Sequence, residues 1–195
     1  KLHLGHRLFL IQLLFEQNID NLDFLGGLPK SDADPDRHLD ILFSSARNTG
    51  KKVHVHVDQL NTPEEQETEW LALKTINYGL EDRVVAVHSI SLACHEKKYR
   101  DYVYDLSKDA GLQFISCPSA WIDHQRSERL TPTHNSLTPV DEMLERGLTV
   151  GIGTDNIEDI YKPYCNGDMM FELRLLLEAY KIYDDDTLID LAYNN

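Results

Sequence analysis

The sequence predicts an α/β fold with parallel strands, the later part of a (β/α)8 TIM-type barrel. Short runs rich in β-branched residues alternate with longer stretches that carry apolar residues at helical spacing. Strands that alternate with helices of roughly 10–15 residues are typical of parallel sheets with crossover helices. A complete barrel of this kind takes about 250 residues, and this 195-residue chain supplies about five strands. We therefore expect residues 1–195 to form one truncated barrel domain.

The expected strands are read from alternation and from residues that end a strand. Residues 53–57 alternate strictly between valine and histidine, which predicts a strand with one apolar face. Residues 112–117 are mostly apolar and end at Pro118, which cannot donate to a ladder of hydrogen bonds. The remaining expected strands are residues 22–28, 83–88 and 148–153.

Capping residues and glycines mark the expected helices. Thr62 followed by Pro63 and two glutamates predicts an N-cap and a first helical turn. The expected helices are residues 8–17, 37–47, 62–78, 96–110, 138–146, 168–182 and 186–193. Residues 119–136 are rich in polar side chains and form a long loop after a strand. Such loops usually carry functional residues, which favours an active-site face at this end of the sheet.

Charge and composition exclude several classes of partner. The chain has 33 acidic and 19 basic residues and a formal net charge of −14. An acidic chain repels phosphate backbones and anionic lipid surfaces, so we expect no nucleic-acid or membrane partner. Neither a GxGxxG nor a GxxxxGKS/T motif occurs, which disfavours nucleotide-binding folds. Three widely spaced cysteines cannot make a disulfide framework and predict a cytoplasmic protein.

Three of the expected strands end in ionisable side chains. His54, His56 and Asp58 share one face of the valine–histidine strand, His88 ends the next strand, and Asp155 follows the last one. Because parallel strands end at one rim of a sheet, we expect His56, His88 and Asp155 to converge there. Two imidazoles and a carboxylate are ligands that suit zinc, iron or manganese. A single strand histidine usually has a structural role, so a metal-free protein with incidental histidines is the alternative.

Four runs of residues resemble a known family. HVHVDQ, VVAVHSIS, FISCPSAWIDHQR and GIGTDNIEDIYKP are similar to strands 5, 6, 7 and 8 of the amidohydrolase superfamily, and GGLP resembles the end of strand 4. His56 and His88 lie 32 residues apart, and Asp155 follows His88 by 67 residues, which is the layout of the cytosine deaminase-like branch. The resemblance covers the chain from about residue 20 onward and implies about strands 4–8 of the barrel.

The resemblance also implies roles for individual residues. His56 corresponds to the strand-5 metal ligand, and Asp155 to the strand-8 ligand and the base that takes a proton from the attacking water. His88 corresponds to a residue that orients water or substrate, or that binds a second metal. We therefore expect a divalent transition metal, zinc, iron or manganese, as one or two ions. Tyr161 and Trp121 are expected to stack on a planar substrate ring.

Two positions depart from that branch. Gln59 stands where the branch has a glutamate, and Asn156 stands where it has a second aspartate. Because an amide cannot act as a general acid, we expect proton transfer to rely on Asp155 and His88, and cytosine is not the expected substrate. Gln59, as a candidate catalytic residue, and Asn156, as a substrate-binding residue, are expected to hydrogen-bond to an amide, urea or heterocycle edge.

The sequence thus predicts a metal-dependent hydrolase of a C–N bond in a cyclic or planar nitrogenous small molecule. Gln59 and Asn156 motivate an alternative, a catalytically impaired barrel that binds a ligand or partner. Members of the family carry a further His-x-His pair on strand 1, which we expect upstream of Lys1. A partial barrel leaves two unpaired sheet edges, which either invite association, for example into a homo-oligomer, or require the missing half of the barrel.

Overall fold

The computed structural model describes residues 21–122, 128 and 136–194 and contains one parallel sheet. The strands follow one another in chain order across the sheet, and every neighbouring pair is parallel. They are β1 (Phe24–Gly27), β2 (Lys52–Val57), β3 (Val84–His88), β4 (Gln113–Ser116) and β5 (Thr149–Ile152). This singly wound order is that of one side of a (β/α)8 barrel, and the predicted α/β class is confirmed.

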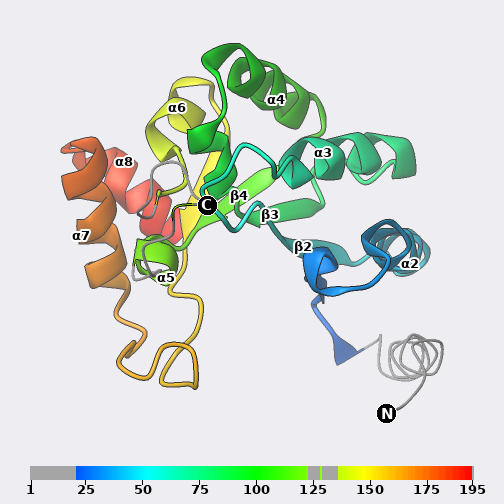
Figure 1. The fold of residues 1–195 in the computed structure, drawn as a ribbon, viewed down its shortest axis with the longest axis horizontal. Helices are drawn as coiled ribbons and strands as arrows, with labels where there is room; N and C mark the ends of the chain where they lie inside the picture. Colours follow the sequence, from blue (N-terminus) through cyan, green and yellow to red (C-terminus); the bar gives the residue numbers. More distant parts are fainter. Residues whose placement is uncertain (1–20, 123–127, 129–135, 195) are drawn as a thin grey trace.

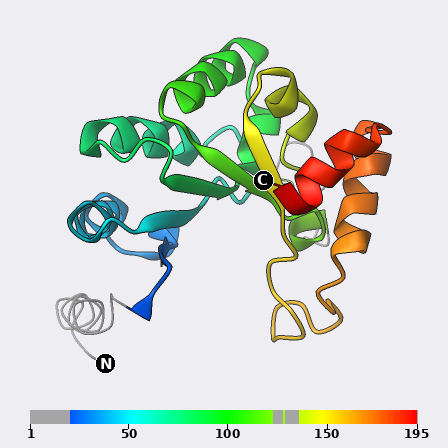
Figure 2. The same cartoon turned by 180° about the vertical axis from the view of Figure 1, so that it is seen from behind.

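Helices connect successive strands and lie around the sheet as an arc (Figures 1 and 2). The α-helices are α2 (Pro35–Thr49), α3 (Glu67–Tyr78), α4 (Lys97–Asp109), α5 (Pro118–Ile122), α6 (Val140–Glu145), α7 (Met169–Tyr180) and α8 (Asp185–Ile189). Shorter turns are the 3-10 helices η2 (Pro29–Ser31) and η3 (Ile90–Cys94) and the π-helical turn η4 (Asp190–Asn194). No helix within the described part of the chain has the length and apolar character needed to cross a lipid bilayer.

The two faces of the sheet have different surroundings. On β2, the side chains of Val53, Val55 and Val57 are fully buried and belong to the main core between sheet and helices. His54 and His56 alternate with them and therefore point to the other face, where they are half-buried. That second face carries a small apolar cluster of its own, formed by Val85, Val87, Ile115, Cys117 and Ala120. The period of two in the sequence thus assigns valines to the core and histidines to the candidate site.

Several element boundaries match the sequence, and the start of α3 does not. The predicted N-cap at Thr62 is wrong, because the helix begins five residues later at Glu67. Thr62 instead accepts a hydrogen bond from the backbone of Glu64 in a turn. The first amide groups of α3, those of Glu67 and Thr68, donate to the carboxylate of Asp58. A carboxylate nearly ten residues upstream therefore supplies the cap that Thr62 was expected to provide.

The chain after β4 departs in part from the predicted loop. The expected loop over residues 119–136 is partly wrong, because α5 begins directly after β4 and extends to Ile122. Most of the remainder of that loop, and the expected helix over residues 8–17, lie outside the described residues. The side chain of Trp121 also lies outside them, so its predicted contact with substrate stays a prediction.

Candidate metal centre

The backbone turns sharply where three strands end. Asp58 after β2, His88 at the end of β3 and Asp155 after β5 have φ angles of 51°, 81° and 60°. L-residues rarely adopt this left-handed region, because the Cβ atom crowds the following carbonyl group. Non-glycine residues held in it cluster at functional sites. Two of these three residues, His88 and Asp155, belong to the predicted site.

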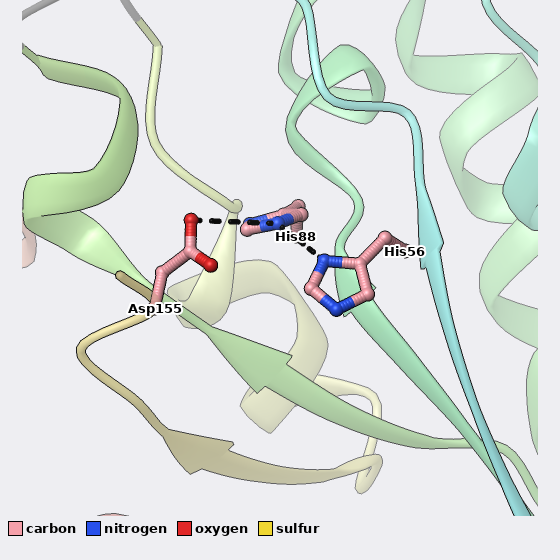
Figure 3. A group of neighbouring side chains, drawn as sticks. All are labelled: His56, His88 and Asp155. Carbon is pink, nitrogen blue, oxygen red and sulfur yellow. Dashed lines mark hydrogen bonds and ion pairs between the residues drawn. The ribbon is translucent and has the colours of Figure 1, made fainter. Parts of the chain in front are cut away.

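The side chains of His56, His88 and Asp155 meet at this end of the sheet (Figure 3). Nδ1 of His56 lies 3.0 Å from Nε2 of His88, and the same Nε2 lies 4.0 Å from Oδ2 of Asp155. One ligand atom from each residue lies within 4.8 Å of the other two. His88 is buried, while His56 and Asp155 remain partly accessible. The structure thus brings together three side chains from three strands that the sequence separates by up to 99 residues.

The three donors fit a divalent transition metal. Two nitrogen ligands about 2.0–2.1 Å from one tetrahedral zinc ion lie about 3.3 Å apart. Nδ1 of His56 and Nε2 of His88 share a hydrogen bond over 3.0 Å, and that separation is close to the value for two zinc ligands. Two imidazoles with one carboxylate also form a ligand set used for iron and manganese. The accessible sides of His56 and Asp155 leave room for further ligands or a water molecule.

Burial sets the charge of these groups. Burial, and to a smaller extent the neighbouring His56, lowers the pKa of His88 to about 3. Burial also lowers the pKa of His56, although the negative charge of Asp155 opposes this. Burial raises the pKa of Asp155 above its usual value, and the positive charges of His56, when it is protonated, and of Lys162 only partly oppose this. Both imidazoles are therefore neutral near pH 7, which is the form that coordinates a metal.

A cavity of about 580 Å³ opens beside the centre and includes His56 and Asp155 in its wall. Its other polar side chain is that of His54, whose ring stacks on Phe24 with 4.1 Å between centroids. Gly153 lies in the wall as well, and a Cβ atom there would stand 3.2 Å from Ile115 and 3.3 Å from Cys117. The strand that leads to Asp155 is thus closely packed against β4.

Three predicted contact residues are not part of the wall of this cavity. Gln59 is half-buried after β2, and Asn156 donates through its amide to the carboxylate of Asp159. Tyr161 is 80 % exposed. The cavity wall described above contains none of these three residues, so their predicted contacts with substrate stay predictions.

The expectation that Asp58 shares a face with His54 and His56 is wrong. β2 ends at Val57, and the positive φ of Asp58 turns its side chain into the protein, where it is fully buried. Besides capping α3, it accepts a hydrogen bond of 2.5 Å from the Thr68 hydroxyl. Asp58 also stands near Glu65 and Glu67 in a second acidic group, where Lys30 forms an ion pair with Glu65. We assign this second group a structural role.

Sequence reasoning missed Lys162, which comes from the loop after Asp155. Its ammonium group donates to the carbonyl oxygen of Ser119 on α5. Its charge also favours the ionised form of Asp155 and so lowers the pKa of that carboxyl group. Nothing in the sequence distinguishes Lys162 from other lysines in polar loops, because its position depends on how the loop folds back toward β4.

The family model described as amidohydrolase family matches residues 19–191 of this chain. The chain belongs to this family. It is 47 % identical over 134 residues to an uncharacterized protein of Haemophilus influenzae. The matched segment covers 67 % of this chain and 49 % of the relative. It is 29 % identical over 160 residues to N-isopropylammelide isopropyl amidohydrolase of Pseudomonas sp. strain ADP, covering 80 % of this chain and 36 % of that protein.

A solved structure supports the same place in the family. The structure of 5-methylcytosine deaminase from Klebsiella pneumoniae liganded with 5-fluorocytosine matches this amidohydrolase chain with a TM-score of 0.80 and 26 % identity. The match covers 92 % of this chain and 45 % of the deaminase. The predicted membership of the deaminase-like branch of the amidohydrolases is confirmed, and the fold is a partial barrel. The chain spans about half or less of the length of these relatives.

Proposed function

We propose that the protein is a metal-dependent hydrolase that cleaves a C–N bond in a cyclic or planar nitrogenous molecule, by deamination or amide hydrolysis. The observation that carries the proposal is the convergence of His56, His88 and Asp155 at one end of a parallel sheet. The relatives support it, because their names describe an amidohydrolase and a deaminase of ring compounds.

In this proposal, His56 and Asp155 hold a divalent transition metal, with His88 beside them as a further ligand or as the group that orients water. When bound, such a metal lowers the pKa of a coordinated water toward neutrality. Asp155 accepts a proton from the attacking water and returns it to the leaving nitrogen. Its raised pKa suits this task, because a base works best when its pKa approaches the working pH.

The remaining predicted residues take part in substrate binding in this proposal. Gln59 offers both a donor and an acceptor, which suits the alternating edge of an amide, a urea or a heterocycle. Asn156 is engaged with Asp159, so its proposed contact requires that bond to break or to be shared. Tyr161 is largely exposed and reaches a ring only if its loop moves toward the cavity. Trp121 is proposed, from the sequence alone, to stack on the substrate ring.

The decisive experiment replaces Asp155 by asparagine in the full-length protein. Asp155→Asn keeps the shape of the side chain and removes the base, so we expect turnover to fall at least about 100-fold. Amine or ammonia release is measured from cytosine, 5-methylcytosine and N-isopropylammelide, with Asp109→Asn, an exposed carboxylate at the end of α4, as the control. Undiminished turnover in Asp155→Asn contradicts the mechanism.

Gln59 and Asn156 favour a second candidate function, a family member that binds a ligand without turning it over. Both positions carry amides where the resemblance implies acids. This candidate predicts wild-type protein without turnover of any tested ring compound, and no gain of turnover in Gln59→Glu. If the wild-type protein binds a metal and turns over a ring compound, the hydrolase is supported and the ligand-binding alternative is excluded.

A further inference from the structure

His88 has a backbone conformation that residues other than glycine rarely adopt. Its φ of 81° and that of Ser89, 52°, are both in the left-handed region. Two successive non-glycine residues in this region persist only where surrounding contacts hold them. The contacts that hold this segment therefore control where the imidazole of His88 lies relative to His56 and Asp155.

The segment after His88 is held from β2 and α3. The amide of Ser89 donates to the carbonyl of Val57 over 3.1 Å, and its hydroxyl lies 3.0 Å from the hydroxyl of Thr68. The amides of Ile90 and Ser91 both donate to the carbonyl of Asp58. These contacts hold the chain directly after His88 from the side of β2 and α3.

A further contact to His88 comes from Thr138, fifty residues further along the chain. The hydroxyl of Thr138 donates to the carbonyl oxygen of His88 over 2.5 Å. The pairing of β3 with β4 reaches only Val87, so the carbonyl of His88 lies beyond that ladder. Thr138 is 2 % exposed, and its own carbonyl accepts a hydrogen bond from the hydroxyl of Tyr180 on α7. Thr138 is thus bonded to α7 through its backbone carbonyl and to the strained residue His88 through its hydroxyl.

We propose that Thr138 is a positioning residue that keeps the imidazole of His88 within reach of His56 and Asp155. The proposal rests on the proposed function and takes His88 as one of the ligands of the metal centre. Loss of the hydroxyl leaves the buried carbonyl of His88 without this donor. The φ of 81° at His88 is then less well supported, and His88 relaxes in a way that moves its imidazole away from His56.

The test uses Thr138→Val, which keeps the shape of the side chain, and Thr138→Ser, which keeps the hydroxyl. Thr75→Val is the matched control, because Thr75 is fully buried and donates to the carbonyl of Leu71 over 2.8 Å within α3. Zinc affinity of the full-length apoprotein is measured by competition with a chelator, and crystal structures of the variants locate His88.

We expect Thr138→Val to lose zinc affinity by roughly 10- to 100-fold, as is usual when a group that orients a ligand is removed. Its crystal structure should show the His88 imidazole displaced from His56, while Thr138→Ser and Thr75→Val keep the wild-type position and affinity. Wild-type zinc affinity together with an unmoved His88 in Thr138→Val overturns the positioning role. Wild-type protein that takes up no zinc contradicts the proposed function instead, and the position of His88 in the Thr138→Val crystal still decides the role of Thr138.

Discussion

At the scale of single residues, the neutral state of His88 links the site to stability. The unfolded chain protonates a histidine at a pKa of about 6.5, whereas burial and His56 lower the folded pKa of His88 to about 3. Below pH 6.5 the unfolded state therefore binds more protons than the folded state. The stability that neutral His88 provides is complete above pH 6.5 and is lost as the pH falls toward 3.

This linkage predicts a pH dependence that His88→Gln removes. Between pH 6.5 and 5 we expect His88 to account for a loss of about 2 kcal/mol in the free energy of unfolding. Urea denaturation of wild type and variant at both pH values, with a chelator present, measures it. The variant should lose about 2 kcal/mol less than the wild type over this interval. Equal losses in the two proteins contradict the assignment of a buried neutral imidazole.

The sequence predicted the identity of the central residues better than the direction of their neighbours. The convergence of His56, His88 and Asp155 could be predicted because each lies at or near the carboxyl end of a strand, and parallel topology brings such positions together. The orientations of Asn156 and Tyr161 depend on a loop whose path is set by contacts to Asp159. These contacts span two or three residues and form a local aspartate turn, which hydrophobic alternation does not reveal.

At the scale of elements, Asp58 joins β2 to α3. Its carboxylate accepts from two backbone amides and one hydroxyl at the start of α3, and all of these groups are buried or partly buried. Its amide in turn donates to the carboxylate of Glu67 over 2.8 Å. Asp58, the residue directly after β2, therefore fixes the position at which α3 begins.

Removal of the buried Asp58 cap should lower the free energy of unfolding more than removal of an exposed helix cap. We expect Asp58→Ala to lower the free energy of unfolding by about 3 kcal/mol, because it leaves buried donors unpaired. Asp34→Ala, which removes the exposed carboxylate that caps α2 by accepting from Arg37, should cost about 1 kcal/mol. Urea denaturation compares the two variants. Equal small losses contradict the structural role of Asp58.

The elements show why strand prediction succeeded and one helix start failed. The alternation over residues 53–57 and the apolar run before His88 are local patterns, and both strands lie where the sequence placed them. The start of α3 depends on Asp58, which is not adjacent to Glu67 in the sequence and caps it only after the chain has turned. A capping rule that considers only neighbouring residues therefore selects Thr62.

At the scale of the whole molecule, binding at the centre requires three strands in their native arrangement. Because the unfolded chain does not hold His56, His88 and Asp155 together, a metal should bind the folded state preferentially and stabilise it. We expect zinc at a hundredfold excess over its dissociation constant to raise the free energy of unfolding by about 2.7 kcal/mol.

The variant His56→Ala checks this stabilisation, because it removes one donor and leaves the strand in place. We expect the zinc-dependent increase in the free energy of unfolding to be absent in His56→Ala. In the wild type, a chelator should reverse this increase. Denaturation in urea with and without zinc measures both effects. An undiminished zinc effect in His56→Ala places the metal elsewhere on the protein.

The strand order has a further consequence for the shape of the sheet. β2 and β5 are separated by two intervening strands, which in a flat sheet puts them about 14 Å apart. The donor atoms of His56 and Asp155 nevertheless lie within 4.8 Å of each other. The turn after β5 and the lengths of the two side chains cover part of this distance, and curvature of the sheet toward the face that carries the histidines covers the rest. A change that flattens the sheet, even one distant from the three residues, would draw Asp155 away from His56.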